Sequence, residues 1–155
     1  MVRKKKKIDW LWICFIGITI VAIILASLVV GFIVKKDIHP HDRINNSDIK
    51  FYPDKVIIEG KFTRGTFVGT HSMIPVIFKN ATSLSIVPSS PDEIIIGDII
   101  TFNHPKEGLM VHRVIKKSSD NKGIYFITKG DNSYARDLYK VRFEDIEKVM
   151  VGIIW

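Results

Sequence analysis

Residues 94–102 read IIIGDIITF, and this run is the clearest indication of the fold class. A run of isoleucines meets a Gly-Asp turn signal and continues into a second run rich in Ile, Thr and Phe, which is typical of a strand entered through a turn. Similar glycine-punctuated runs predict further strands at 56–62, 84–87, 109–115, 124–128 and 149–155. Only residues 143–148 indicate a short helical turn. We therefore predict a mainly β domain, a sandwich or an open barrel.

A different kind of segment precedes this domain. Residues 10–34 form a run of 25 uncharged, nearly all apolar residues. As a helix this run would extend about 37 Å, enough to cross a hydrocarbon core of roughly 30 Å. Trp10 and Trp12 at its start suit the headgroup region. We predict an uncleaved transmembrane helix at 10–34. The alternative, a cleaved signal peptide, would have a shorter apolar run followed by a small-x-small site, and neither is found here.

Most of the positive charge lies at the start of the chain. The net charge is +7, from 23 Lys+Arg and 16 Asp+Glu, and residues 3–7 are all basic. Offset only by Asp9, they predict a cytoplasmic N-terminus and a β domain on the outer face of the membrane. Beyond residue 34, Lys and Arg only slightly outnumber Asp and Glu. They form no basic stripe and no nucleic-acid-binding motif. Membrane lipid is therefore an expected partner and nucleic acid is not.

Composition and spacing complete the predicted organisation. A hydrophobic fraction of 46% excludes a disordered chain. The single cysteine, Cys14, excludes an intrachain disulfide. We predict a cytoplasmic tail at 1–9, the transmembrane helix, a polar linker at 35–50 and an extracytoplasmic domain at 51–155. His39 and His41 in the linker lack further ligands nearby, so no metal site is predicted.

Four segments of the predicted domain carry residues suited to joint chemistry. Ser72 lies in a proline-bounded turn, His112 lies on a predicted strand, and Asp131 and Asp137 flank a Gly/Asn turn. A serine hydroxyl is a poor nucleophile until a base takes its proton, an imidazole is such a base near neutral pH, and an acid often orients the imidazole. Each residue alone has an ordinary structural explanation. Their combination predicts nucleophilic catalysis.

The same segments resemble, in order, the sequence boxes of type I signal peptidases. They are Ser72-Met73-x-Pro75, the GDIITF run at 97–102, the VHRVI run at 111–115 and KGDN at 129–132 followed by Asp137. His112 stands where the usual bacterial branch has a lysine. The chain is therefore similar to the endoplasmic-reticulum-type branch, which also occurs in archaea and in some Gram-positive bacteria. The predicted N-terminal anchor fits as well.

The resemblance implies a membrane-bound serine endopeptidase that removes signal peptides from exported preproteins with small residues before the cut. It implies no metal or organic cofactor and a signal-peptidase-like catalytic domain behind one transmembrane helix. By position, Ser72 is the nucleophile and His112 the general base. Asp131 and Asp137 are the acids of the last box. Asp137 is favoured for orienting the imidazole, but the sequence does not order the two.

The resemblance also implies how substrate is held. The Ser72 backbone N–H and the Thr70 hydroxyl would bind the oxyanion. Met73 and Pro75 belong to the same box and are predicted to bind substrate. The extended peptide would lie along a strand edge.

Some positions depart from the family pattern, and two alternatives remain open. His71 stands where a glycine usually precedes the serine, Ile74 replaces an acidic residue, and residues 76–91 lack the usual Gly-Asp turn. One alternative is a Ser–Lys peptidase of the same superfamily, with Lys129 or Lys116 as base. The other is a non-catalytic, membrane-anchored envelope module with degenerate boxes.

Overall fold

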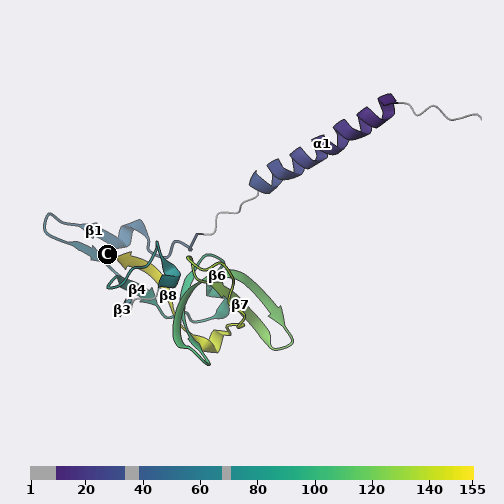
Figure 1. Ribbon diagram of the computed structural model, residues 1–155. Coiled ribbons are helices and arrows are strands. Elements are labelled where there is room, and N and C mark those ends of the chain that lie inside the picture. Colours follow the sequence, from purple (N-terminus) through teal and green to yellow (C-terminus); the bar gives the residue numbers. More distant parts are fainter. Residues whose placement is uncertain (1–9, 34–38, 68–70) are drawn as a thin grey trace, which may run out of the picture. The chain divides into compact units, whose positions relative to one another are not determined.

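The computed structural model describes residues 10–33, 39–67 and 71–155 (Figure 1). The chain forms two compact units, residues 1–37 and residues 38–155. Within its described residues, the first contains one helix, α1 (Trp10–Ile33), whose sequence is largely apolar. Among the described residues, no helix has both the length and the apolar character needed to cross a membrane.

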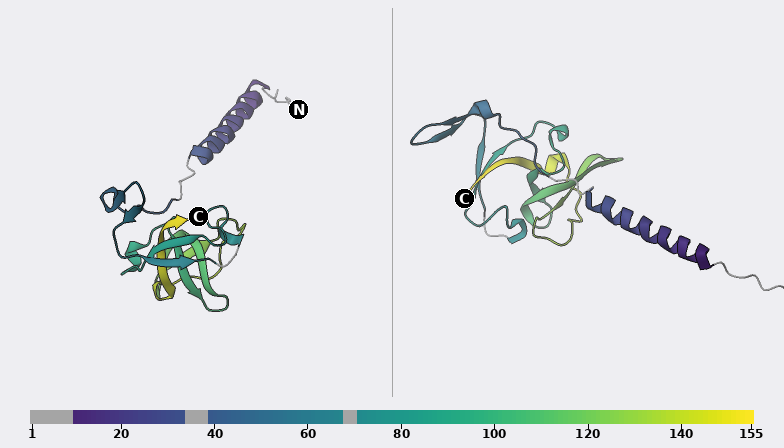
Figure 2. Two further views of the ribbon diagram at one scale, coloured as in Figure 1. Left: turned by 90° about the vertical axis from the view of Figure 1, so that its left-hand side faces the viewer. Right: turned by 90° about the horizontal axis from the view of Figure 1, so that it is seen from above.

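The second unit is mainly β, as the sequence predicts, and its strands pair antiparallel. A small hairpin pairs β1 (Ile49–Phe51) with β2 (Val56–Ile58). A six-stranded antiparallel sheet has the order β3-β4-β8-β5-β6-β7 and curls as it passes from strand to strand (Figure 2). Its strands are β3 (Thr63–Thr66), β4 (Thr82–Ile86), β5 (Ile99–His104), β6 (Gly108–Asp120), β7 (Gly123–Lys129) and β8 (Ile146–Ile154).

Two apolar cores lie on opposite faces of this sheet. Ile100 and Val149 belong to one core, whereas their chain neighbours Ile99 and Met150 belong to the other. Successive side chains of a strand point to opposite faces, so β5 and β8 supply both cores. The second core also contains Met73, which fixes the segment around Ser72 to the sheet.

Glycines with positive φ account for two strand limits that the sequence prediction misses. The predicted strand 56–62 is interrupted after Ile58, close to Gly60, whose φ is +151°. The predicted strand 94–102 begins only at Ile99, after a turn at Gly97 with φ +106°. L-residues rarely adopt these backbone angles, so each glycine marks a turn where β-propensity alone predicts continuation.

Two strands, β1 and β3, were not predicted, and the other differences concern short turns and strand lengths. The helical turn predicted at 143–148 is a single 3-10 turn, η4 (Phe143–Asp145), and β8 begins at once after it. The other 3-10 turns are η1 (Asn46–Asp48), η2 (His71–Met73) and η3 (Pro91–Glu93).

Part of the predicted linker lies against the β domain. The Arg43 guanidinium donates hydrogen bonds to the Asp98 carboxylate and to the Glu93 carbonyl. The His41 backbone N–H donates to the other Asp98 oxygen at 3.3 Å. The compact unit therefore starts at residue 38, well before the boundary predicted at residue 51.

Candidate active site

Ser72 lies in η2, a one-turn segment that ends at the buried Met73. Met73 packs into the second core, so the backbone of Ser72 is held while its side chain stays half-buried. His71 is exposed and is not among the residues lining the cavity beside Ser72. Thr70, the predicted oxyanion donor, lies outside the described residues.

The segment around Gly130 packs directly on the segment around Ser72. The Asn132 backbone N–H donates to the Ser72 carbonyl at 2.8 Å, and Asn132 Nδ2 donates to the His71 carbonyl at 3.1 Å. A Cβ added to Gly130 would lie only 2.7 Å from the Ser72 carbonyl oxygen. Glycine permits this approach because it has no side chain. Two boxes far apart in sequence therefore meet.

His112 lies on β6, is buried, and is held by an acid. Its Nδ1 lies 2.6 Å from Asp137 Oδ2, and Thr128 Oγ1 donates to the same oxygen at 2.6 Å. An ionised carboxylate only accepts hydrogen bonds, so the imidazole donates from Nδ1. In the neutral ring the lone pair then lies on Nε2. That is the tautomer a general base requires.

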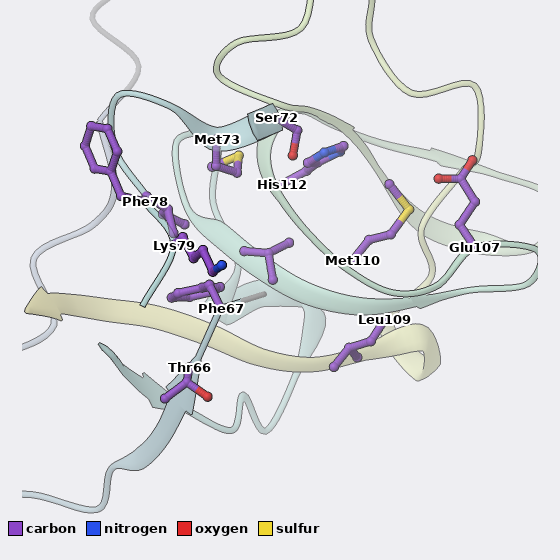
Figure 3. A pocket seen from close by; sticks show the side chains of 12 residues that line it. Thr66, Phe67, Ser72, Met73, Phe78, Lys79, Glu107, Leu109, Met110 and His112 are labelled. Atoms are coloured by element: carbon purple, nitrogen blue, oxygen red, sulfur yellow. The ribbon is translucent and has the colours of Figure 1, made fainter. Parts of the chain in front are cut away.

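Ser72 and His112 line one cavity of about 420 Å³. Figure 3 shows the Ser72 hydroxyl directed toward the imidazole. Most of the lining is apolar: Phe67, Met73, Ile77, Phe78, Leu109, Met110 and Val111. The charged lining residues are Lys79 and Glu107. The cavity thus combines an apolar wall with a hydroxyl and an imidazole, as sites that bind and react with an organic group commonly do.

Asp131 has a different partner from Asp137. Arg113 Nε donates to Asp131 Oδ1 at 2.7 Å, and Arg113 Nη2 donates to Oδ2 at 2.6 Å. Arg113 Nη1 also donates to the Gly97 carbonyl at 2.8 Å. His112 and Arg113 are neighbours on a strand, so they point to opposite faces. Of the two acids that the sequence leaves unordered, Asp137 contacts the imidazole and Asp131 braces the adjoining turns.

The other predicted residues divide between the cavity and its surroundings. Met73 lines the cavity, whereas Pro75 is exposed and contributes to a separate pocket with Trp155. Lys116 and Lys129, the alternative bases, are not among the lining residues, but Lys79 is. Figure 3 shows Lys79 on the side of Phe67.

Sequence reasoning missed several polar residues near the site, among them Thr128 and Lys79. Thr128 precedes the KGDN run, and its β-branched side chain is what any strand position favours, so no sequence signal separates it from a structural residue. Lys79 lies within residues 76–91, which lack the turn that is usual in the family. The resemblance therefore did not indicate Lys79 as a site residue.

Within the described ranges, no group of three or more His, Cys, Asp or Glu side chains gathers as a metal site would. Comparisons of the chain with known protein families, characterised proteins and solved structures give no match. A hydroxyl, an imidazole in the base tautomer and an orienting carboxylate together suit nucleophilic attack on a carbonyl.

Proposed function

We propose that the chain is a membrane-anchored serine endopeptidase that removes signal peptides from exported preproteins. The observation that carries this proposal is the pairing of His112 Nδ1 with Asp137, which leaves Nε2 for the cavity shared with Ser72. The order of the sequence boxes resembles that of type I signal peptidases, and this resemblance favours exported preproteins as the substrates. The same resemblance favours a signal-peptidase-like fold for the β domain.

The proposed reaction follows from these three side chains. His112 Nε2 takes the Ser72 hydroxyl proton as Oγ attacks the scissile carbonyl. His112 then gives that proton to the leaving amine, and an acyl-enzyme remains on Ser72. Water, deprotonated by the same imidazole, then attacks the acyl carbon, and the imidazole returns the proton to Ser72 Oγ as the acyl–Oγ bond breaks. The Ser72 N–H and the Thr70 hydroxyl would stabilise the oxyanion, each donor being worth about 3 kcal/mol in the transition state.

The edge of the sheet offers a path for the peptide. β3 is an edge strand, and Thr66 at its end lines the cavity. An extended substrate can add to such an edge through main-chain hydrogen bonds, while the apolar cavity receives its side chains. In this proposal the residues before the cut run beside β3 toward Ser72.

The anchoring part of the proposal rests on the sequence. The 25 uncharged residues at 10–34, preceded by the basic run 3–7, favour a single span with a cytoplasmic N-terminus. The catalytic domain would then lie outside the cytoplasm. A signal peptide is itself an apolar membrane segment. Holding enzyme and substrate in one bilayer raises their effective concentration at the cut.

The decisive experiment uses the full chain in lipid vesicles with a preprotein that carries a small-x-small cleavage site. Ser72→Ala should lower the processing rate by at least about 1,000-fold, because the nucleophile is lost. Ser119→Ala is the matched control, since Ser119 is an exposed hydroxyl on β6. Equal processing by Ser72→Ala and the wild type would refute the peptidase and favour a non-catalytic envelope module.

A lysine base is the second candidate, and Lys79 in the cavity lining now joins Lys129 and Lys116. His112→Ala should remove most activity, whereas each lysine→Ala variant should retain it. The opposite pattern would assign the base to a lysine.

A further inference from the structure

Thr128 and Asp137 are joined by two hydrogen bonds. The Asp137 backbone N–H donates to the Thr128 carbonyl at 2.8 Å, and Thr128 Oγ1 donates to Asp137 Oδ2 at 2.6 Å. Thr128 itself has 0% exposed surface and lies in β7. One fully buried residue therefore fixes both the main chain and the carboxylate of Asp137.

The strand register brings Thr128 near His112. Arg113 on β6 pairs with Lys129 on β7, and Val114 pairs with Thr128. Thr128 and His112 therefore stand on the same face of adjacent strands, as diagonal neighbours. Asp137 joins them from the following loop, and its Oδ2 accepts from both side chains.

Little else holds Asp137 in place. The neighbouring Leu138 is 93% exposed, and Arg136 is exposed as well, so neither fixes the loop by packing. The Asp137 carboxylate is itself partly accessible, at 19%. The carboxylate accepts hydrogen bonds from the His112 imidazole and from the Thr128 hydroxyl, so Thr128 is the donor that fixes it independently of the imidazole.

We propose that Thr128 is a positioning residue for catalysis: through Asp137 it fixes the orientation and tautomer of the His112 imidazole. This inference rests on the proposed function. The hydroxyl holds the carboxylate where it accepts from Nδ1, so Nε2 of the neutral ring keeps its lone pair for the cavity that Ser72 also lines.

Two substitutions separate the hydroxyl from the shape of the side chain. Thr128→Val keeps the branched side chain and removes the donor. Thr128→Ser keeps the donor and removes a methyl group. In preprotein processing by the full chain in vesicles, we expect Thr128→Val to lower kcat about 10- to 100-fold with little change in KM, and Thr128→Ser to restore most of it.

A double-substitution cycle distinguishes positioning from a structural role. If Thr128 acts through Asp137, Thr128→Val should cause no further loss of kcat in an Asp137→Ala background. A structural residue would give the same additional loss in both backgrounds. Ser85→Ala is the control for removing a buried strand hydroxyl, because its partner is Ser83 on β4. It should leave kcat unchanged, and thermal unfolding of each variant reports whether the fold survives.

The outcomes separate this inference from the proposed function. If Ser72→Ala or His112→Ala processes preprotein like the wild type, both fail together. If Ser72 and His112 are needed but Thr128→Val retains wild-type kcat, only the role of Thr128 is overturned. Equal losses in Thr128→Val and Thr128→Ser, or additive losses with Asp137→Ala, would likewise overturn it.

Discussion

The missing side chain of Gly130 lets the segment 129–132 approach Ser72 closely. An added Cβ would meet the Ser72 carbonyl oxygen at 2.7 Å and Ser72 Cβ at 3.1 Å. Backbone atoms cannot turn away as the end of a long side chain can. We expect Gly130→Ala to push Ser72 out of line with His112 and to lower kcat about 100-fold, because small displacements of reacting groups are costly.

Gly152→Ala is the matched control for this prediction. Its added Cβ would make only ordinary contacts with Leu84, at 3.7 Å. Both variants are compared for kcat in preprotein processing and for melting temperature. Wild-type kcat in Gly130→Ala would show that the contact does not position Ser72.

The two acids show the limit of sequence reasoning at the residue scale. The sequence predicted Ser72, His112 and a pair of aspartates as candidate site residues, because hydroxyl, imidazole and carboxylate groups are the types that nucleophilic catalysis needs. It did not choose between Asp131 and Asp137. That choice depends on where a strand places Arg113, which takes Asp131 and leaves Asp137 for the imidazole. A sequence gives residue types, whereas the pairing of charges requires distances in space.

At the scale of elements, Asp120 fastens the hairpin of β6 and β7 to the segment before β8. It accepts hydrogen bonds from Lys140 Nζ at 2.8 Å, from Arg142 Nη2 at 2.9 Å and from the Lys122 backbone N–H at 3.0 Å. These donors, Lys140 first, hold the pKa of Asp120 well below its ordinary value. The hairpin carries His112 and Thr128, so this fastening supports the site from its far end.

The pKa of Asp120 predicts how stability depends on pH. Because the pKa is lowered in the folded state, the carboxylate stabilises the fold above its unfolded pKa near 4 and loses this effect as pH falls toward the folded pKa. Asp120→Asn should therefore melt at a lower temperature than the wild type at pH 7, and the gap should narrow below about pH 4. Circular dichroism melts at several pH values measure this.

Asp92→Asn serves as the control for that series. Asp92 is 84% exposed and lies 3.4 Å from Lys117 Nζ, so its loss should change the melting temperature little at any pH. A gap between Asp120→Asn and the wild type that stays constant down to pH 2 would contradict the linkage argument.

Strands could be predicted from the sequence where the local residue types determine the secondary structure. β7 and the core of β6 form where runs of Ile, Val and Phe predict strands, because a half-buried strand selects those residues. The strand predicted through Gly60 fails, since a single positive φ outweighs the propensity of its neighbours. Propensity adds over a window, whereas a turn depends on one residue.

At the scale of the whole chain, the segment before β1 belongs to the β domain through a long-range ion pair. Its polar, turn-rich sequence is typical of a linker, and nothing local reveals that Arg43 meets an aspartate 55 positions away. The sequence did indicate that Asp98 lies in a turn, and its Oδ2 accepts the Ile95 N–H at 3.0 Å. It could not indicate that the same carboxylate also accepts hydrogen bonds from Arg43 and from the His41 N–H.

We expect the ion pair of Arg43 and Asp98 to contribute substantially to the free energy of unfolding. Asp98 is fully buried and Arg43 is only 10% exposed, and Nη2 lies 2.5 Å from Oδ2. Removing one member of a buried pair leaves an uncompensated charge, so Arg43→Ala should lower the free energy of unfolding by about 3 kcal/mol. Lys50→Ala breaks an exposed pair with Glu59 and should cost under about 1 kcal/mol. Urea denaturation of both variants measures the difference, and equal small losses would mean that the segment at 39–43 is only loosely attached to the domain.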